Sequence, residues 1–367
     1  MNPETSLIHY RVAHWDRSSR IGLAAMAVVT IALAAAPYWG DRETLRLLTE
    51  AFSYVALASL WNLLAGYAGL VSIGQQAFVG LGGYTLFLSA LWLGLNPLLG
   101  VPIAGILAGL FAVPVVLLLF RLRGAYFTIG SWVIADILQQ VFLQVDAVGG
   151  GSGISLPAAI VKSIAASREA REIMIYGTFL ILVVAVLGLI VLLLRSRWGL
   201  ALQAIRDNEI AAKSNGVDVD RARLVVFVVA AAGTAMVGAM IFLQRLTITP
   251  VSGFSINDWT VNVIFITVIG GIGRIEGPIV GTIIYLLLRE FLADLGSIYL
   301  ITLGVVGIAV MLKAPKGLWG YVADRFGWQA FPLSRRLIVI PNGAAPANPA
   351  GKPIGVSDAP VGSRAGK

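Results

Sequence analysis

The sequence predicts an all-α fold, a polytopic transmembrane helical bundle of about ten spans. Hydrophobic residues make up 58% of the 367 positions, charged residues only 13%, and the mean hydropathy is +0.85. Apolar runs of about 20 residues, the length that crosses a bilayer as a helix, recur between residues 21 and 310. The alternation of polar and apolar residues typical of a membrane β-barrel is absent. These observations indicate a helical membrane protein.

The predicted spans follow one another along most of the chain. They cover residues 21–38, 51–67, 76–93, 98–120, 125–145, 173–194, 224–243, 259–271, 278–295 and 298–312. A helix rises about 1.5 Å per residue and the hydrocarbon layer is about 30 Å thick, so the run at 259–271 is too short to cross alone. We therefore expect a tilted or broken helix at that place.

The distribution of basic residues predicts the orientation and the domain boundaries. If the spans alternate from an inside N-terminus, 20 of the 27 Lys and Arg residues lie on the inner side, as the positive-inside rule requires. This predicts a cytoplasmic N-terminal segment (1–20), a transmembrane domain (21–313) with a cytoplasmic loop at 195–223, and a cytoplasmic tail (314–367). The tail is rich in Pro, Gly and Ala from about 341 onward and is expected to be disordered there.

The sequence lacks the usual parts of an enzyme. It contains no cysteine, and its two histidines, His9 and His14, lie in the N-terminal segment. No Gly-rich loop ending in Gly-Lys-Ser/Thr is present, so ATP coupling requires another subunit. We expect no catalytic residues, no metal site and no cofactor. The net charge of +8 follows the membrane topology, and no nucleic-acid binding is expected.

The polar loop at 195–223 has the pattern of a short amphipathic helix. Trp198, Leu202 and Ile205 fall on one helical face, and Arg206 and Asp207 fall on the other. Asp207 or Asn208 can cap a second helical piece that ends at the Asn-Gly pair 215–216. In an arbitrary membrane protein such a loop is more often a solvated connection than a docking site. Here the apolar face is expected to contact the bundle and the charged edge to contact a soluble partner.

Two clusters of small and polar residues predict breaks in transmembrane helices. Residues 66–85 contain six glycines together with Ser72, Gln75 and Gln76, and a similar cluster lies at 252–262. Non-helical backbone at membrane depth occurs only beside protein or a water-filled cavity, so these polar side chains are expected to line a pathway. Close helix packing explains the glycines equally well. The clusters fall in the third and eighth predicted spans, which suggests an inverted repeat of five spans.

Asp136 is the clearest charged residue within a predicted span. A carboxylate facing lipid at a helix centre costs ~2.5–3.5 kcal/mol, so this side chain is expected to face the interior of the bundle. Arg289 and Glu290 lie near a span end, where their charges can reach the membrane surface. An ion-coupled secondary carrier that uses Asp136 is the alternative from another class. A single intramembrane carboxylate argues against that alternative without excluding it.

Six stretches resemble one known family. They read GYAGLVSIGQQAFVGLGGYT (66–85), RLRGAYFTIGSWVIAD (121–136), AVGGGSGI (147–154), WGLALQAIRDNEIAAKSNGVDV (198–219), VIGGIGRIEGPIVG (268–281) and KAPKGLWG (313–320). In this order and spacing they resemble the LivM-type permease subunits of branched-chain amino-acid ABC importers. The resemblance covers about residues 50–320.

The resemblance implies a non-catalytic permease of the bacterial inner membrane. It implies a LivH-like sister permease, two cytoplasmic ATP-binding subunits, a periplasmic substrate-binding protein and a small-molecule substrate. The substrate is expected to be a branched-chain or related amino acid, while relatives in the same family act on urea, short amides or aromatic acids.

The resemblance also implies two sets of functional residues. Coupling to the ATPase falls on Trp198, Gly199, Arg206, Asp207, Asn208, Glu209, Ala211, Ala212 and Gly216. The family's pathway motif falls on Gly69, Ser72, Gly74, Gln75, Phe78 and Tyr84. The residue patterns described above add Gln76, Asp136, Ser252, Asn257 and Asn262 to the expected translocation pathway.

Overall fold

The structure is a computed structural model that describes residues 9–13, 17–122, 124–165, 167–292, 298–314, 316–326 and 336–340. It consists of two units. In the first, strand β1 (His9–Ala13) pairs antiparallel with β4 (Arg336–Ile340), with His9 opposite Ile340. The second unit spans residues 17–333 and contains the helical bundle. The strand pair was not predicted, and the tail expected to be disordered from about 341 lies outside the described residues.

The second unit confirms the predicted all-α polytopic fold. Its first half contains α1 (Arg17–Ala34), η1 (Ala36–Tyr38), α2 (Arg42–Asn62), η2 (Leu63–Tyr67), α3 (Gln75–Trp92), α4 (Pro97–Leu119) and α5 (Ala125–Gln144). Two short 3₁₀ turns, η3 (Asp146–Val148) and η4 (Gly150–Ser152), then lead to β2 (Ile154–Ser155) and α6 (Ala158–Ile164).

The second half continues with α7 (Arg168–Arg195), α8 (Arg197–Asp207), α9 (Glu209–Ser214), α10 (Val219–Arg245) and β3 (Thr247–Ile248). It ends with α11 (Pro250–Gly253), η5 (Asn257–Val261), α12 (Asn262–Gly270), α13 (Glu276–Leu292), α14 (Ile298–Lys313) and α15 (Gly317–Phe326). Within the described residues, seven helical segments are long and apolar enough to cross a membrane. The remaining predicted spans form helices α1, α3 and α13, which fall below that limit of length or hydropathy.

Helix starts are set by polar caps that the hydrophobic pattern did not reveal. α2 begins at Arg42 rather than near residue 51, because the Asp41 side chain accepts a hydrogen bond from the Thr44 amide (3.1 Å). In the same way Ser167 caps α7 and Asp218 caps α10. Because the capped first turns are polar, the apolar run of each of these helices begins several residues after the helix itself.

The predicted break in the eighth span is present. The segment begins with the short helix α11, becomes irregular at Phe254, and resumes as a π-helical turn (η5) that leads into α12. A second π-helical turn, η2, ends α2 immediately before the non-helical residues 68–74. The break expected from the second cluster is therefore present, whereas the third predicted span is the unbroken helix α3 and residues 68–74 connect α2 to it.

The core of the bundle depends on close contact between α3 and α10. A Cβ atom added to Gly82 would lie 2.7 Å from the Cα of Ala235, and one added to Gly238 would lie 2.7 Å from the Cα of Val79. Small residues on both helices thus bring the two backbones together, which is how transmembrane helices gain packing energy without a hydrophobic driving force.

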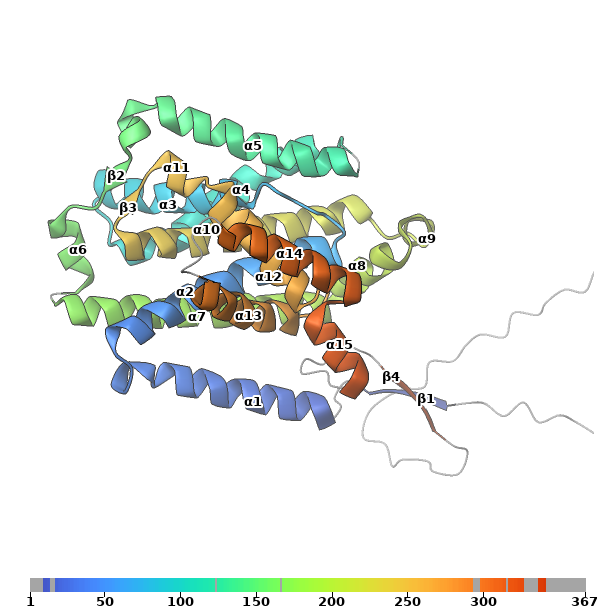
Figure 1. Cartoon of the computed structure of the whole chain (residues 1–367). Helices are drawn as coiled ribbons and strands as arrows, with labels where there is room; N and C mark the ends of the chain where they lie inside the picture. The colour runs from blue at the N-terminus through green and yellow to red at the C-terminus, as the bar shows by residue number, and fades with distance from the viewer. Residues whose placement is uncertain are drawn as a thin grey trace, which may run out of the picture. The chain divides into compact units, whose positions relative to one another are not determined.

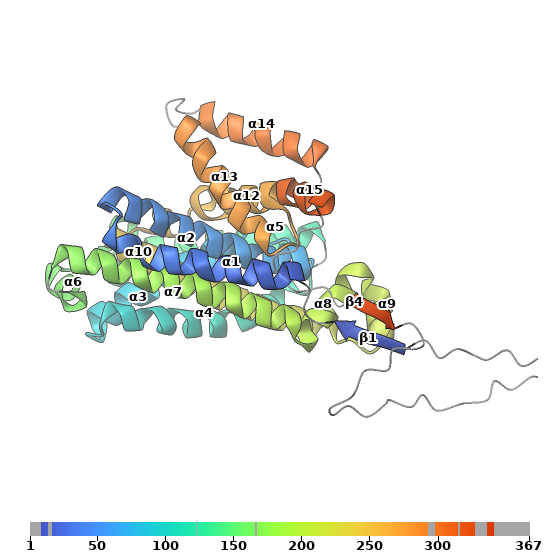
Figure 2. The ribbon, with the colours of Figure 1, turned by 90° about the horizontal axis from the view of Figure 1, so that it is seen from below.

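The elements outside the spans gather at opposite ends of the bundle. The β2–β3 pair and α6 lie at one end, whereas α8, α9 and α15 lie at the other (Figures 1 and 2). The helix pair α8–α9 is therefore well separated along the bundle from the β2–β3 end.

Candidate functional site

The polar loop at 195–223 is ordered as two helices, α8 and α9. The Ser196 side chain caps α8 through the Trp198 amide (3.1 Å). Leu202 and Ile205 are buried against the bundle, and Trp198 is partly buried. Arg206 on the opposite face is exposed. The predicted division of this helix into an apolar and a charged face is thus present.

The corner between α7 and α8 requires a glycine. A Cβ atom at position 199 would lie 2.6 Å from the Cα of Leu194. Gly199 is therefore buried in the corner and allows close approach of the two helices, and it offers no surface to a partner.

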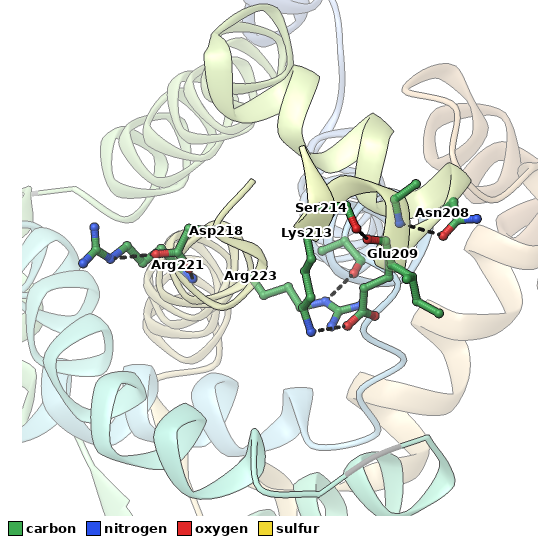
Figure 3. A network of polar contacts seen from close by, with 10 residues as sticks. Asn208, Glu209, Lys213, Ser214, Asp218, Arg221 and Arg223 are labelled. Atoms are coloured by element: carbon green, nitrogen blue, oxygen red, sulfur yellow. Dashed lines mark hydrogen bonds and ion pairs between the residues drawn. The ribbon is translucent and has the colours of Figure 1, made fainter. Parts of the chain in front are cut away.

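Helix α9 is capped and held by ion pairs (Figure 3). The Asn208 side chain accepts a hydrogen bond from the Ala211 amide (3.0 Å). Glu209 Oε1 accepts from Lys213 Nζ (2.9 Å), and Glu209 Oε2 accepts from Arg223 of α10 (2.9 Å). Gly216 ends the segment with a φ of 80°, a value that favours glycine.

The hydrogen bonds from Lys213 and Arg223 hold the pKa of the Glu209 carboxyl below its usual value. Because folding lowers this pKa, the ion pairs stabilise the helix pair above the unfolded pKa and at neutral pH. They lose that contribution as the pH falls through the lowered, folded pKa.

Two arginines connect this helix pair to the end of α2. Arg206 donates to the carbonyl oxygen of Gly66 (3.4 Å), and Arg223 Nε donates to that of Ala68 (3.3 Å). Arg223 therefore contacts α9 through Glu209 and the backbone after α2 at the same time. Its side chain is only 20% exposed.

Several backbone groups of the non-helical residues 68–74 form hydrogen bonds with neighbouring side chains. Trp61 of α2 donates to the Ser72 carbonyl (2.8 Å), and Thr128 of α5 donates to the Val71 carbonyl (2.8 Å). Ser131 Oγ accepts from the Ile73 amide (3.0 Å). An irregular segment at membrane depth is stable only with such internal partners.

This segment leads directly into a buried polar joint at the start of α3. Gln75 Nε2 donates to Thr234 Oγ1 of α10 (2.7 Å), and Thr260 Oγ1 of η5 donates to Gln76 Oε1. Among the described residues, Gln75 Oε1 finds no partner although it is buried. An unpaired buried acceptor costs about 1–3 kcal/mol, so this arrangement leaves room for a better-bonded alternative.

The predicted pathway residues other than Asp136 lie on the segment 68–74, on α3 and on the broken segment 250–262. The buried ones are Ser72, Gly74, Gln75, Gln76, Phe78 and Tyr84. Two are partly buried, Ser252 and Asn262, and two are exposed, Gly69 and Asn257. Ser252 closes a capping box with Thr249, and its carbonyl accepts from the Trp259 indole (2.7 Å). The predicted inverted repeat of five spans remains a prediction.

Asp136 lies elsewhere and differs from the expectation. It was expected to face the interior of the bundle, but it is exposed on the outer side of α5. Among the described residues none forms a hydrogen bond or ion pair with it. Its neighbours on this open surface, Ile137, Gln140, Val141, Gln144 and Val145, all belong to α5 or its C-terminal end. The reason is that the other face of α5, with Phe127, Ser131 and Ala135, packs against the bundle.

Sequence reasoning missed several residues that hold this site together. Arg223 was counted only as a basic loop residue, and Trp61, Thr128 and Ser131 were not singled out. No local pattern marks them, because each acts on backbone groups distant in the sequence.

Comparison with known proteins identifies the family to which the chain is similar. The profile of a family described as "Branched-chain amino acid transport system / permease component" matches residues 44–314. The chain is 28% identical to the high-affinity branched-chain amino acid transport system permease protein LivM of Escherichia coli (strain K12) over 348 residues, 89% of this chain and 78% of that protein.

Two further relatives show the breadth of the similarity. The LivM protein of Salmonella typhimurium is 28% identical over 81% of this chain and 74% of its own length. A probable branched-chain amino acid transport permease protein LivH of Methanocaldococcus jannaschii is 27% identical over 41% of this chain and 49% of its own length. No solved structure matches the chain significantly.

Proposed function

Because this chain belongs to the branched-chain amino acid transport system permease family, we propose that it is the membrane permease subunit of an ATP-driven importer. It moves branched-chain or related amino acids inward, as the names of its LivM relatives suggest. ATP is hydrolysed on two separate cytoplasmic subunits, a periplasmic protein delivers the amino acid, and a LivH-like sister permease completes the membrane part. The complex lies in the bacterial inner membrane.

The observation that carries this proposal is the ordered helix pair α8–α9. It offers a partner two exposed apolar side chains, Leu200 and Ile210, beside the charged edge at 206–208. Its other face is anchored by buried Leu202 and Ile205. A helix pair with one face fixed and the other exposed suits the transfer of movement from a soluble subunit.

The orientation in the membrane follows from the same helix pair. In the proposed orientation α8, α9 and α15 are cytoplasmic, together with both termini, in agreement with the excess of basic residues on that side. Movement of the helix pair α8–α9 then reaches residues 66–68 through Arg206 and Arg223. It reaches the polar joint at Gln75 and Gln76 through the segment 68–74. A change of partners at this joint opens the pathway alternately to either side.

Ile210→Asp is expected to weaken binding of the ATP-binding subunits by about tenfold or more. Ile210 is 80% exposed, and burial of an isoleucine against a partner contributes about 1.5–3 kcal/mol. The measurement is the dissociation constant of the purified permease complex and its ATP-binding subunits. Tyr38→Asp is the matched control, since Tyr38, the last residue of η1, is 92% exposed. Equal binding by the parent and Ile210→Asp would show that α9 is not the contact.

Uptake into proteoliposomes tests the function as a whole. The assembled importer is expected to accumulate leucine only with internal ATP-binding subunits, ATP and the external binding protein. Urea, acetamide and benzoate are added as competitors of leucine uptake. Inhibition by one of them would show that the importer takes that alternative class of substrate. Uptake that continues without ATP, collapses with the ion gradient and is lost in Asp136→Asn would instead establish an ion-coupled carrier.

A further inference from the structure

The turn between α12 and α13, residues 271–275, is packed tightly against its neighbours. Gly271 and Gly273 have φ values of 128° and 78°, which favour glycine. A Cβ atom added to Gly317, the first residue of α15, would lie 2.9 Å from the carbonyl carbon of Gly270. The turn is therefore in direct contact with the start of α15, and its backbone has little freedom to move alone.

The side chain of Asn62, the last residue of α2, holds this turn from within the bundle. Its Nδ2 donates to the Arg274 carbonyl (2.7 Å), and its Oδ1 accepts from the Gly273 amide (2.7 Å). Asn62 is only 2% exposed. A side-chain amide offers both a donor and an acceptor, whereas a carboxylate or an apolar side chain of this size cannot form both bonds.

Arg206 of α8 reaches the same turn from the other side. It donates to the Gly66 carbonyl (3.4 Å), and a Cβ atom added to Gly273 would lie 2.8 Å from its Nη1. Gly66 in turn packs on Gly273, since a Cβ atom at Gly66 would lie 2.8 Å from the Cα of Gly273. Helix α8, the end of α2 and the turn 271–275 thus meet at one point.

Helix α12 connects this turn to the polar joint. It is continuous with η5, from which Thr260 donates to Gln76 at the start of α3. The segment 68–74 leads to the start of α3 from the other direction. Two connections from the helix pair α8–α9 therefore end on opposite partners of the Thr260–Gln76 bond.

We propose that Asn62 is a positioning residue that couples α8 to the turn 271–275. A displacement of α8 then reaches Thr260 through α12 at the same time as it reaches Gln76 through the segment 68–74, and it acts on both sides of their hydrogen bond. This inference rests on the proposed function for the identity of the partner that displaces α8, an ATP-binding subunit.

Asn62→Leu is expected to reduce leucine uptake by about tenfold while the assembled importer still hydrolyses ATP, as for a lost coupling free energy of about 1–3 kcal/mol. Uptake and ATP hydrolysis are measured on the same proteoliposomes, and the readout is the amount of ATP hydrolysed per leucine. A value equal to that of the parent would overturn the proposal.

Asn96→Leu is the matched control for this variant. Asn96 also donates to one backbone carbonyl, that of Ser163 in α6 (3.3 Å), and accepts from one amide, that of Leu98 (3.0 Å). It lies at the α6 end of the bundle, away from α8. The control is expected to lose stability through its missing helix cap while the ATP hydrolysed per leucine stays at the value of the parent. An equal rise of this value in both variants would show that Asn62 has only a structural role.

The absence of cysteine from the chain allows a second measurement, made on the purified permease. Spin labels are attached at Gln203→Cys, an exposed position of α8, and at Ile272→Cys, a position in the turn that is 45% exposed. Double electron–electron resonance is expected to give one narrow distribution of distances in the parent and a broader one in Asn62→Leu. Asn62→Asp keeps the acceptor and loses the donor, so an intermediate width is expected and the test remains open if Asn62→Leu does not assemble. Equal widths in the parent and in these variants would overturn the proposal.

The spin-label readout needs neither uptake nor ATP hydrolysis. If the parent importer fails to transport while the distribution broadens in Asn62→Leu, the link between Asn62 and α8 stands and the proposed transport function is wrong. If the parent transports leucine and the widths are equal, the reverse holds.

Discussion

Gly82→Ala is expected to lower the apparent melting temperature of the purified permease by about 5 °C or more. The added methyl group would meet the backbone of Ala235, which cannot turn aside as a flexible side chain can. The helices α3 and α10 must then separate, and overpacking of this kind costs about 1–3 kcal/mol or more. Thermal unfolding followed by size-exclusion chromatography measures the loss.

Gly177→Ala on α7 is the matched control. A Cβ atom at Gly177 meets nothing within 4 Å. Alanine is favoured over glycine inside a helix by about 1 kcal/mol, so this variant is expected to be as stable as the parent or slightly more stable. A similar loss of stability in both variants would show that α3 and α10 are not in close contact.

Arg223→Gln is expected to reduce amino-acid uptake by about tenfold or more while the assembled importer still hydrolyses ATP, since a coupling free energy of about 1–3 kcal/mol corresponds to a 5–150-fold effect. The variant loses the charge-assisted bond to Glu209 and weakens the bond to the Ala68 carbonyl. Movement of α9 then no longer reaches the segment 68–74. Uptake and ATP hydrolysis measured on the same proteoliposomes separate coupling from catalysis.

Arg221→Gln provides the control on the same helix. The side chain of Arg221 is 81% exposed. Among the described residues its one ion-pair partner is Asp218, the cap of α10, with Arg221 Nε 3.0 Å from Asp218 Oδ2 (Figure 3). This variant is expected to transport like the parent. Glu209→Gln removes the charge that Arg223 and Lys213 contact and is expected to show a weaker form of the Arg223→Gln defect. Unchanged uptake in Arg223→Gln, or equal losses at 221 and 223, would contradict a coupling role for Arg223.

The sequence by itself determined the fold class, the place of most spans, the break in the eighth predicted span and the amphipathic nature of α8. These properties depend on composition and on neighbours three or four residues apart, and such neighbours are visible in a single sequence. The cap of α9 by Asn208 and the stop at Gly216 were predictable for the same reason. Starts of helices were less accurate, because polar first turns hide their helical nature in a search for apolar runs.

Only the tertiary structure decided what each polar side chain meets. Arg223 reaches a carbonyl oxygen 155 positions earlier in the chain, and Thr260 reaches Gln76 across 184 positions. Asp136 shows the same limit. The free-energy cost of a carboxylate in lipid predicts a polar environment for it, but not whether its face of α5 packs against the bundle. The face of α5 that packs on the bundle is set by the partners of Phe127, Ser131 and Ala135. Sequence periodicity fixes which residues share a face, whereas the packing of distant segments fixes what that face contacts.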